Sequence, residues 1–210
     1  GWPGKVVWDF IEGPTTTGLV PPELRAERAE IVKQTAGFAK ALGADMVMTH
    51  IGFVPEDPNE PKYTELLPVL RDIAAHCAGL GQQFCVETGQ ETPITLLRTI
   101  VDVGADNMGV NFDPANLLMY GKANPVDAVD TLAPWIRGVH IKDGLYPVNG
   151  SKLGEEKPLG TGQVDFPAFL AKIDKLGYTG SLCIETEVPQ TERVAAVSAA
   201  KRQLEAWLGR

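Results

Sequence analysis

The chain has 210 residues, 44% of them hydrophobic and 22% charged, which is typical of a soluble globular protein with one sizeable core. The formal net charge is −8 and lysine and arginine do not cluster, so nucleic-acid binding, which depends on neutralising phosphates, is not expected. No apolar run approaches the roughly 20 residues that span a bilayer, and residues 1–10 lack the pattern of a signal peptide, so we expect no membrane partner.

Short runs rich in β-branched and aromatic residues alternate along the chain with longer segments of helical spacing. The predicted strands cover residues 5–10, 45–51, 83–88, 107–112, 136–141 and 181–186. The predicted helices cover residues 22–42, 62–80, 92–103, 125–133, 166–176 and 190–208. Asp165 is the predicted N-cap of the fifth helix, and glycine follows four of the helices, where a left-handed backbone favours it: Gly43, Gly81, Gly104 and Gly177.

Strands that alternate with helices in this way predict βαβ units and a parallel sheet. Six such units follow one another without a linker, which predicts one α/β domain over residues 1–210. A doubly wound sheet and a TIM (β/α)₈-type barrel both fit this pattern. No predicted strand is followed by G-x-G-x-x-G or by a Walker-type lysine loop, which argues against the nucleotide-binding forms of the doubly wound sheet.

Four predicted strands end in a side chain that can bind a metal ion. These side chains are Glu87 in FCVET, Asp113 in VNFDP, His140 in GVHIKD and Glu185 in LCIET. Because strand side chains alternate, each of them shares a face with small or polar residues, and bulky apolar residues occupy the opposite face. In a barrel the first face is the interior, and active sites gather at the carboxyl ends of the strands. We therefore expect the four side chains to converge.

Three carboxylates held close together repel one another unless protons or a cation neutralise them. One neutral imidazole together with three carboxylates suits a divalent ion such as Mn²⁺, Mg²⁺, Co²⁺ or Zn²⁺. Because oxygen ligands dominate and no thiolate takes part, the harder ions are favoured. We expect one Mn²⁺ ion, with Mg²⁺, Co²⁺ and Zn²⁺ as alternatives.

Further polar side chains lie near the ends of the same strands. His50 closes the second predicted strand, where it either contacts a substrate or is a structural histidine. Lys142 and Asp143 border the same expected cleft, and Asn116 lies in the loop after the fourth predicted strand. The connection 142–163 is long, and long loops in compact domains are often functional. We expect His50, Asn116, Lys142 and Asp143 to bind substrate.

The three cysteines, Cys77, Cys85 and Cys183, are widely spaced. They form neither a CxxC metal motif nor an obvious disulfide framework. Apolar neighbours indicate inert thiols in the core, and a reduced, cytoplasmic setting fits them best.

Five stretches, in this order along the chain, resemble a known family: FCVETGQET, GVNFDPANLLMYGK, GVHIKDG, PLGTGQVDFPAFL and LCIETE. They are similar to the xylose-isomerase-like TIM barrels grouped as sugar phosphate isomerases/epimerases, from about residue 18 onward. The resemblance implies a barrel that binds a divalent metal ion through the fifth to eighth strands, here through Glu87, Asp113, His140 and Glu185. It also implies that residues 5–10 form the third strand and that the first two βα units are absent from this sequence.

Two positions differ from the ketose 3-epimerases of this family. Those enzymes carry a histidine three residues after the metal-binding aspartate, where this chain has Asn116. They also carry an arginine after the histidine ligand, where this chain reads HIKDGLYP. HIKD and PLGTGQVDF are more similar to the inosose-dehydratase-like members.

The leading hypothesis is a divalent-metal-dependent isomerase or epimerase that acts on a sugar or a related polyol ketone. Glu87 and Glu185 would form the catalytic pair, one removing a proton next to the carbonyl and the other returning one through an enediolate. A lyase of the inosose-dehydratase type on a keto-polyol is the alternative. A non-catalytic binding barrel also stays open, as does a homo-oligomer, whereas the acidic balance and only three histidines argue against a phosphodiester endonuclease.

Overall fold

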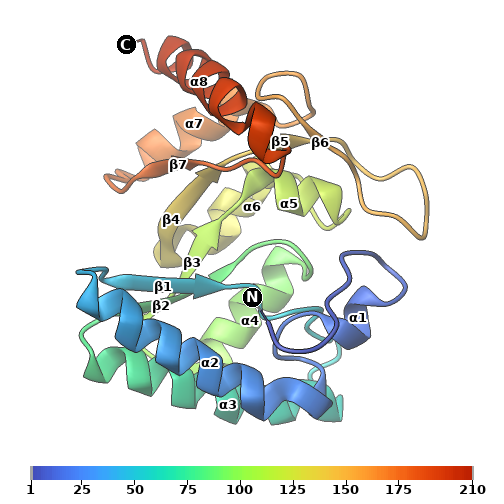
Figure 1. Cartoon of the computed structure of the whole chain (residues 1–210), viewed down its shortest axis with the longest axis vertical. Helices are drawn as coiled ribbons and strands as arrows, with labels where there is room; N and C mark the ends of the chain where they lie inside the picture. The colour runs from blue at the N-terminus through green and yellow to red at the C-terminus, as the bar shows by residue number, and fades with distance from the viewer. Residues whose placement is uncertain (1, 210) are drawn as a thin grey trace.

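The structure is a computed structural model that describes residues 2–209. Five parallel strands form one sheet in the order β1-β2-β3-β4-β7, and this sheet curls into a half-barrel (Figure 1). The strands are β1 (Met46–Thr49), β2 (Gln83–Glu87), β3 (Met108–Phe112), β4 (Ile136–Ile141) and β7 (Leu182–Ile184). The predicted α/β fold of the TIM-barrel type is confirmed.

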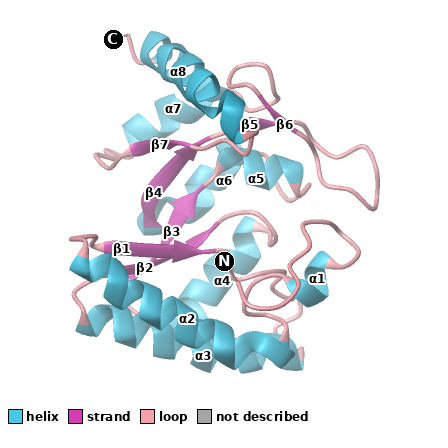
Figure 2. Cartoon of the chain, viewed as in Figure 1, coloured by secondary structure: helices cyan, strands magenta, loops and turns pink. Residues whose placement is uncertain are grey.

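The long helices lie on the outer side of the curled sheet (Figure 2). Asp165 accepts a hydrogen bond from the amide of Ala168 at 3.1 Å, which confirms the predicted N-cap. None of the described helices combines the length and the apolar character needed to cross a membrane. All six begin and end within one residue of their predicted bounds: α2 (Pro22–Ala41), α3 (Pro61–Gly79), α4 (Pro93–Val103), α6 (Pro125–Leu132), α7 (Phe166–Lys175) and α8 (Gln190–Trp207).

Short elements that were not predicted lie in the connections. They are α1 (Gly13–Thr16), α5 (Pro114–Met119), the 3₁₀ helix η1 (Ala133–Trp135), and the antiparallel pair β5 (Asp143–Gly144) and β6 (Glu156–Lys157). The β5–β6 pair folds the long loop after β4 back on itself, beside the carboxyl end of the sheet.

The predicted strand at 5–10 is wrong, because these residues pair with no strand of the described chain. Side chains hold this segment instead. The amide of Val7 donates to Thr16 Oγ1 at 3.1 Å, and its carbonyl accepts from Thr17 Oγ1 at 3.0 Å. A β-rich run becomes a strand only where a neighbouring strand offers its own backbone groups. Residues 2–209 therefore contain five βα units rather than six.

Large apolar side chains fill the core between the sheet and the outer helices. Phe112 of β3 stacks on Phe169 of α7 with 5.5 Å between ring centroids, and Phe166 of α7 stacks on Trp207 of α8 at 4.8 Å. Full burial of one such side chain stabilises the fold by roughly 1.5–3 kcal/mol. These contacts tie α7 to the sheet and α8 to α7.

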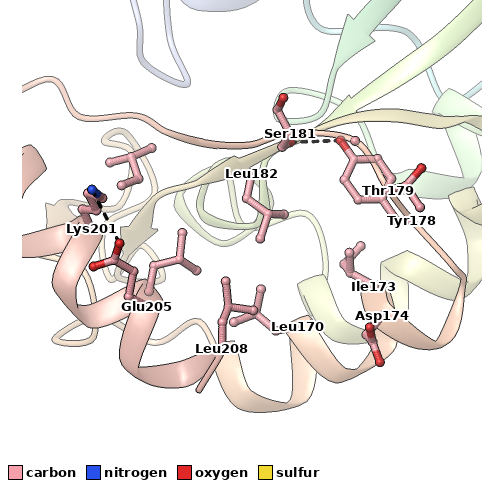
Figure 3. A pocket seen from close by; sticks show the side chains of 13 residues that line it. Leu170, Ile173, Asp174, Tyr178, Thr179, Ser181, Leu182, Lys201, Glu205 and Leu208 are labelled. Atoms are coloured by element: carbon pink, nitrogen blue, oxygen red, sulfur yellow. Dashed lines mark hydrogen bonds and ion pairs between the residues drawn. The ribbon is translucent and has the colours of Figure 1, made fainter. Parts of the chain in front are cut away.

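The packing leaves a hollow of about 790 Å³ on the helix-covered side of β7 (Figure 3). Apolar side chains from three elements form much of its lining: Leu170, Ile173, Leu182, Leu204 and Leu208. Because strand side chains alternate, this face of β7 is opposite to the one that carries Glu185. The hollow is therefore separate from the residues predicted to bind a metal ion.

Two of the three cysteines are core thiols, as predicted. Cys77 and Cys85 are buried, and burial raises the pKa of Cys85 to about 12. The prediction is wrong for Cys183, which is exposed. Cys183 lies on the inner face of β7, an edge strand that pairs with β4 and with no other strand of the described chain. Without a neighbour on its free edge, this strand leaves the thiol open to solvent.

Candidate metal centre

Four side chains meet at the carboxyl ends of the strands. Glu87 ends β2, Asp113 directly follows β3, His140 lies in β4 and Glu185 directly follows β7. One ligand atom from each lies within 4.8 Å of the ligand atoms of the other three. The parallel register sets these strand ends side by side, since β2 pairs with β3, β3 with β4, and β4 with β7. The structure thus brings together the four residues that strand alternation had placed on one face.

His140 lies at the centre of this cluster. Its Nδ1 atom is 2.6 Å from Glu185 Oε2, 3.3 Å from Glu87 Oε1 and 3.4 Å from Asp113 Oδ2. Three of these atoms, His140 Nδ1, Asp113 Oδ2 and Glu185 Oε2, are buried and make no hydrogen bond. Buried polar atoms in native proteins are normally hydrogen-bonded, so three such atoms aimed at one point indicate a missing partner. A cation can accept lone pairs from all three.

The charges in the cluster shift one another's pKa. Burial raises the pKa of Asp113 to about 6. Burial would also raise the pKa of Glu185, but His140 and Lys142 outweigh it and lower that pKa to about 2. For His140, burial opposes the charged form, but the nearby carboxylates of Asp113, Glu185 and Glu87 raise its pKa to about 12. In the metal-free protein a proton on His140 therefore takes the place of a cation.

The donor set fits a divalent metal ion. Three carboxylates and one imidazole supply hard oxygen ligands and one nitrogen ligand. Hydrogen bonds also hold two of the carboxylates in place. Asn116 Nδ2 donates to Glu87 Oε1 at 3.1 Å, and Asp113 Oδ1 accepts from the amide of Asn116 at 2.9 Å. Supports of this kind orient metal ligands in known sites.

Comparison with known proteins identifies the family. A family model described as a xylose isomerase-like TIM barrel matches residues 14–208. The chain belongs to this family. The crystal structure of a xylose isomerase domain protein from Planctomyces limnophilus is 38% identical in sequence, with a TM-score of 0.90, and the match covers 100% of this chain and 76% of that chain.

Two further proteins are similar to this chain at lower sequence identity. The uncharacterized protein MJ1311 of Methanocaldococcus jannaschii is 23% identical over 176 residues, which cover 78% of this chain and 58% of that protein. An L-ribulose 3-epimerase shares the fold with a TM-score of 0.71 at 20% identity, over 93% of this chain and 72% of that chain. The chain thus spans less than two thirds of the length of this curated relative.

In this xylose isomerase-like protein, Asn111 supports His140 at its second ring nitrogen. Asn111 Nδ2 lies 3.1 Å from His140 Nε2. The hydrogen bond at the second nitrogen of a metal-binding histidine fixes its tautomer and its orientation. When His140 offers Nδ1 to an ion, Nε2 carries the proton. The side-chain amide of Asn111 is then turned over, so that its oxygen accepts the hydrogen bond from Nε2. Asn111 precedes Asp113 by two residues, so strand alternation gives both side chains the same face.

Gly138→Ala is expected to weaken metal binding by about 10- to 100-fold, the usual effect of losing such a support. A Cβ atom on Gly138 would lie 2.3 Å from Asn111 Oδ1, so the asparagine side chain must move away from His140. Calorimetric titration with Mn²⁺ measures the effect. Gly37→Ala is the control, because a Cβ atom there meets nothing within 4 Å. Equal affinity in the two variants would contradict this role of Asn111.

Three of the four residues expected to bind substrate lie beside the four candidate metal ligands. His50 Nε2 is 3.6 Å from Glu87 Oε1, and burial lowers the pKa of His50, so its ring is neutral. Lys142 Nζ is 3.6 Å from Glu185 Oε1 and 3.4 Å from Asn116 Oδ1. His50, Asn116 and Lys142 thus border the cluster that the four ligands form.

Asp143, which was expected to bind substrate, instead holds the backbone of the loop 142–163. Its carboxylate accepts hydrogen bonds from four backbone amides, at 2.9 Å from Gly144, Gly160 and Gly162 and at 3.2 Å from Val164. Both of its oxygens are therefore engaged. Strand alternation could have predicted this. Asp143 is three residues after His140, so its side chain points to the face of the strand opposite to that of His140.

Two residues near the cluster were missed in the sequence. The ring of Trp8 lies edge-on to His50, with 5.4 Å between centroids, and Glu187 Oε1 is 2.7 Å from Lys142 Nζ. Trp8 falls in the segment that had been predicted as a strand. Glu187 follows Glu185 at a spacing of two, which is the signal that could have found it.

Metal affinity is expected to rise with pH. His140, with a pKa of about 12 in the metal-free protein, holds a proton near neutral pH, and an ion must displace that proton. The apparent association constant should therefore rise about tenfold per unit between about pH 7 and 9. The rise should be steeper below about pH 6, where Asp113 also holds a proton.

Calorimetric titration in buffers of different ionisation enthalpy measures the protons released on metal binding. Release of about one proton per ion is expected near neutral pH. An affinity that stays constant over this range would contradict the raised pKa of His140 in the metal-free protein.

Proposed function

We propose that the protein is a divalent-metal-dependent isomerase or epimerase that acts on a sugar or a related polyol ketone by proton transfer through an enediolate. The observation that carries this proposal is the convergence of Glu87, Asp113, His140 and Glu185, in which three buried ligand atoms lack hydrogen bonds. Mn²⁺ is the proposed ion, and Mg²⁺, Co²⁺ and Zn²⁺ are alternatives that the same ligands accept.

Two structures that share the fold are described with a bound metal ion, which supports a metal-binding role. A xylose isomerase-like TIM barrel protein from Mycobacterium smegmatis is described in complex with magnesium, with a TM-score of 0.64 at 20% identity. The IOLI protein is described with a binding zinc atom, with a TM-score of 0.73 at 17% identity. Because both are below 25% identity, the ligand set of this chain, rather than the likeness, carries the proposal.

Glu87 and Glu185 are the pair that we propose to transfer the proton. Glu87 ends β2 and Glu185 directly follows β7, with β3 and β4 between these strands, so they reach the cluster from different sides. A bound ion would polarise the substrate carbonyl and acidify the neighbouring C–H group. One of the two carboxylates removes the proton from that carbon, and the other carboxyl group returns a proton. Return to the opposite face of the same carbon inverts a centre, whereas return to the adjacent carbon isomerises the sugar.

Neighbouring side chains set the charges for this transfer. Burial opposes the charged form of Lys142, but Asp113 and Glu185 raise its pKa above the ordinary value, so it stays an ammonium group. This charge lies 3.6 Å from Glu185 Oε1 and favours the carboxylate form that a base requires. Neutral His50 can donate to or accept from a substrate hydroxyl group, since its buried Nδ1 makes no hydrogen bond.

A lyase of the inosose-dehydratase type, acting on a keto-polyol, is the second candidate. The buried ammonium group of Lys142 lies beside the cluster, where it can stabilise a departing hydroxide. One structural neighbour, from Bacillus anthracis, is described as the probable 3-DHS dehydratase AsbF, with a TM-score of 0.68 at 19% identity. In this reaction the carbanion formed next to the carbonyl expels a β-hydroxide instead of accepting a proton.

Incubation of the Mn²⁺-loaded protein with L-ribulose, D-allulose and a keto-inositol in D₂O separates these candidates. Metal is removed before NMR spectra are recorded. An epimer or isomer that carries deuterium next to the carbonyl in part of the product is expected. A deoxy or unsaturated product would contradict the isomerase and support the lyase. No product from any of the three, with metal bound, would favour a non-catalytic binding barrel.

A further inference from the structure

Glu185 is the least enclosed of the four candidate metal ligands. Its side chain is 32% exposed, whereas those of Glu87, Asp113 and His140 are 9% exposed or less. It directly follows β7, a strand of three residues that pairs with β4 on one side and with no strand of the described chain on the other. The strands β2, β3 and β4 each lie between two neighbours. The sheet therefore supports Glu185 less than it supports the other three.

The carboxylate of Glu156 supplies a further support, from the long loop after β4. Thr186 Oγ1 donates a hydrogen bond to Glu156 Oε1 at 2.6 Å, and the amide of Glu187 donates to both carboxylate oxygens, at 3.1 and 3.0 Å. Figure 1 shows β6 beside the segment that joins β7 to α8. Hydrogen bonds to an ionised carboxylate are roughly twice as strong as neutral ones. One side chain thus holds the two residues that directly follow Glu185.

A short ribbon holds Glu156 in turn. It begins β6, which pairs with β5, and Gly144 lies opposite Glu156 in the register. The amide of Leu145 donates to the carbonyl of Glu155 at 2.9 Å and extends this pairing. Only Lys142 separates β5 from β4, the strand that carries His140. The ribbon therefore links the strand of one candidate ligand to the segment that carries another.

The contacts of Glu156 lie outside its own loop. Asp143 binds backbone amides of the loop 142–163, and Glu155 pairs with Lys157 at 2.7 Å. The Glu156 carboxylate forms no ion pair within residues 2–209, and its hydrogen bonds go to Thr186 and Glu187. A carboxylate that served only the loop would bind within it, as Asp143 does.

We propose that Glu156 is a positioning residue for Glu185. By holding Thr186 and Glu187, it keeps the Glu185 carboxylate turned toward the other three candidate ligands. The same contact places the side chain of Glu187, whose Oε1 atom lies 2.7 Å from Lys142 Nζ. This inference rests on the proposed function, because it concerns a ligand of that metal centre.

The test is calorimetric titration of the full chain with Mn²⁺. Glu156→Ala should weaken binding by about 10- to 100-fold, the usual effect of losing a residue that orients a ligand. Glu156→Gln should restore most of the affinity, because its amide oxygen can accept from both Thr186 and Glu187. Glu155→Ala is the matched control. It removes a neighbouring carboxylate that is 74% exposed and pairs with Lys157, and its affinity should equal that of the wild type.

Two further readouts separate positioning from a general loss of stability. The visible absorption of bound Co²⁺ reports the geometry of its ligands, so Glu156→Ala should change this spectrum and Glu156→Gln should not. In the metal-free protein, the amide of Glu187 should lose protection from hydrogen exchange in Glu156→Ala and keep it in Glu155→Ala. Thr186→Val removes a donor and leaves the carboxylate in place, and it should weaken Mn²⁺ binding by about 3- to 10-fold.

Unchanged Mn²⁺ affinity in Glu156→Ala, or an equal loss in Glu155→Ala, would overturn the inference. A Co²⁺ spectrum of Glu156→Ala that matches the wild type would do the same. Should Glu156→Ala fail to fold, Thr186→Val decides, and wild-type affinity in that variant would overturn the inference. A wild-type protein that takes up no Mn²⁺ would count against the metal centre itself, whereas normal uptake by both the wild type and Glu156→Ala would overturn only the role of Glu156.

Discussion

Glu185→Gln is expected to lower the affinity for Mn²⁺ by about 100-fold or more and to abolish turnover, because a neutral amide replaces a charged ligand and a catalytic carboxylate. Metal content after gel filtration, read by elemental analysis, measures the loss of the ion. The thermal midpoint gives a second readout. A saturating ion stabilises the native protein by roughly 2.7 kcal/mol at 100 times its Kd, and the variant should lose this gain.

The control for this prediction is Glu205→Gln on α8. Its side chain is 43% exposed and lies 3.5 Å from Lys201, so its loss should change neither metal content nor the thermal midpoint by a measurable amount. His140→Ala should behave like Glu185→Gln, since it removes the ligand at the centre of the cluster. Unchanged metal content in Glu185→Gln and His140→Ala would contradict the assignment of these two ligands.

Asp143→Ala is expected to lower the free energy of unfolding by about 3–5 kcal/mol, the largest loss of stability that we expect from one substitution. The buried carboxylate accepts four backbone amides, and its removal leaves these donors without a partner. Asp143→Asn should be intermediate, because its amide keeps one acceptor oxygen but turns an NH₂ group toward the donors. Urea unfolding of the wild type and the two variants measures the free energy of unfolding.

The matched control is Asp130→Ala, which removes an exposed ion pair with Lys172. Surface pairs of this kind contribute about 0–1 kcal/mol. Hydrogen exchange adds a local readout, since the amides of Gly160 and Gly162 should lose protection in Asp143→Ala and keep it in the control. Equal stability of Asp143→Ala and Asp130→Ala would show that the loop does not depend on this carboxylate.

The helices and the convergence of the four candidate metal ligands could be predicted from the sequence because both depend on local periodicity. An apolar stripe with a cap such as Asp165 determines a helix wherever it lies in the fold. Alternation along each strand places Glu87 and Glu185 on the inner face, and parallel pairing then aligns the strand ends. The same alternation gave the correct side for Asp143, although the prediction assigned it to substrate.

The remaining features depend on partners that are distant in the sequence. Residues 5–10 have the composition of a strand, but side chains of Thr16, Thr17 and Arg28 satisfy their backbone groups. Local pattern could not show this, nor that the segment places the Trp8 ring against His50, beside the candidate metal centre. Cys183 is exposed for a similar reason, because its burial would require a strand beyond the edge of β7.

The metal centre is tested most directly by crystals grown with Mn²⁺ and measured for anomalous scattering. One peak per chain is expected, bounded by Glu87, Asp113, His140 and Glu185, and the peak should vanish in Glu185→Gln. A wild-type crystal with no peak among these four side chains, or with its Mn²⁺ bound elsewhere, would contradict the metal centre.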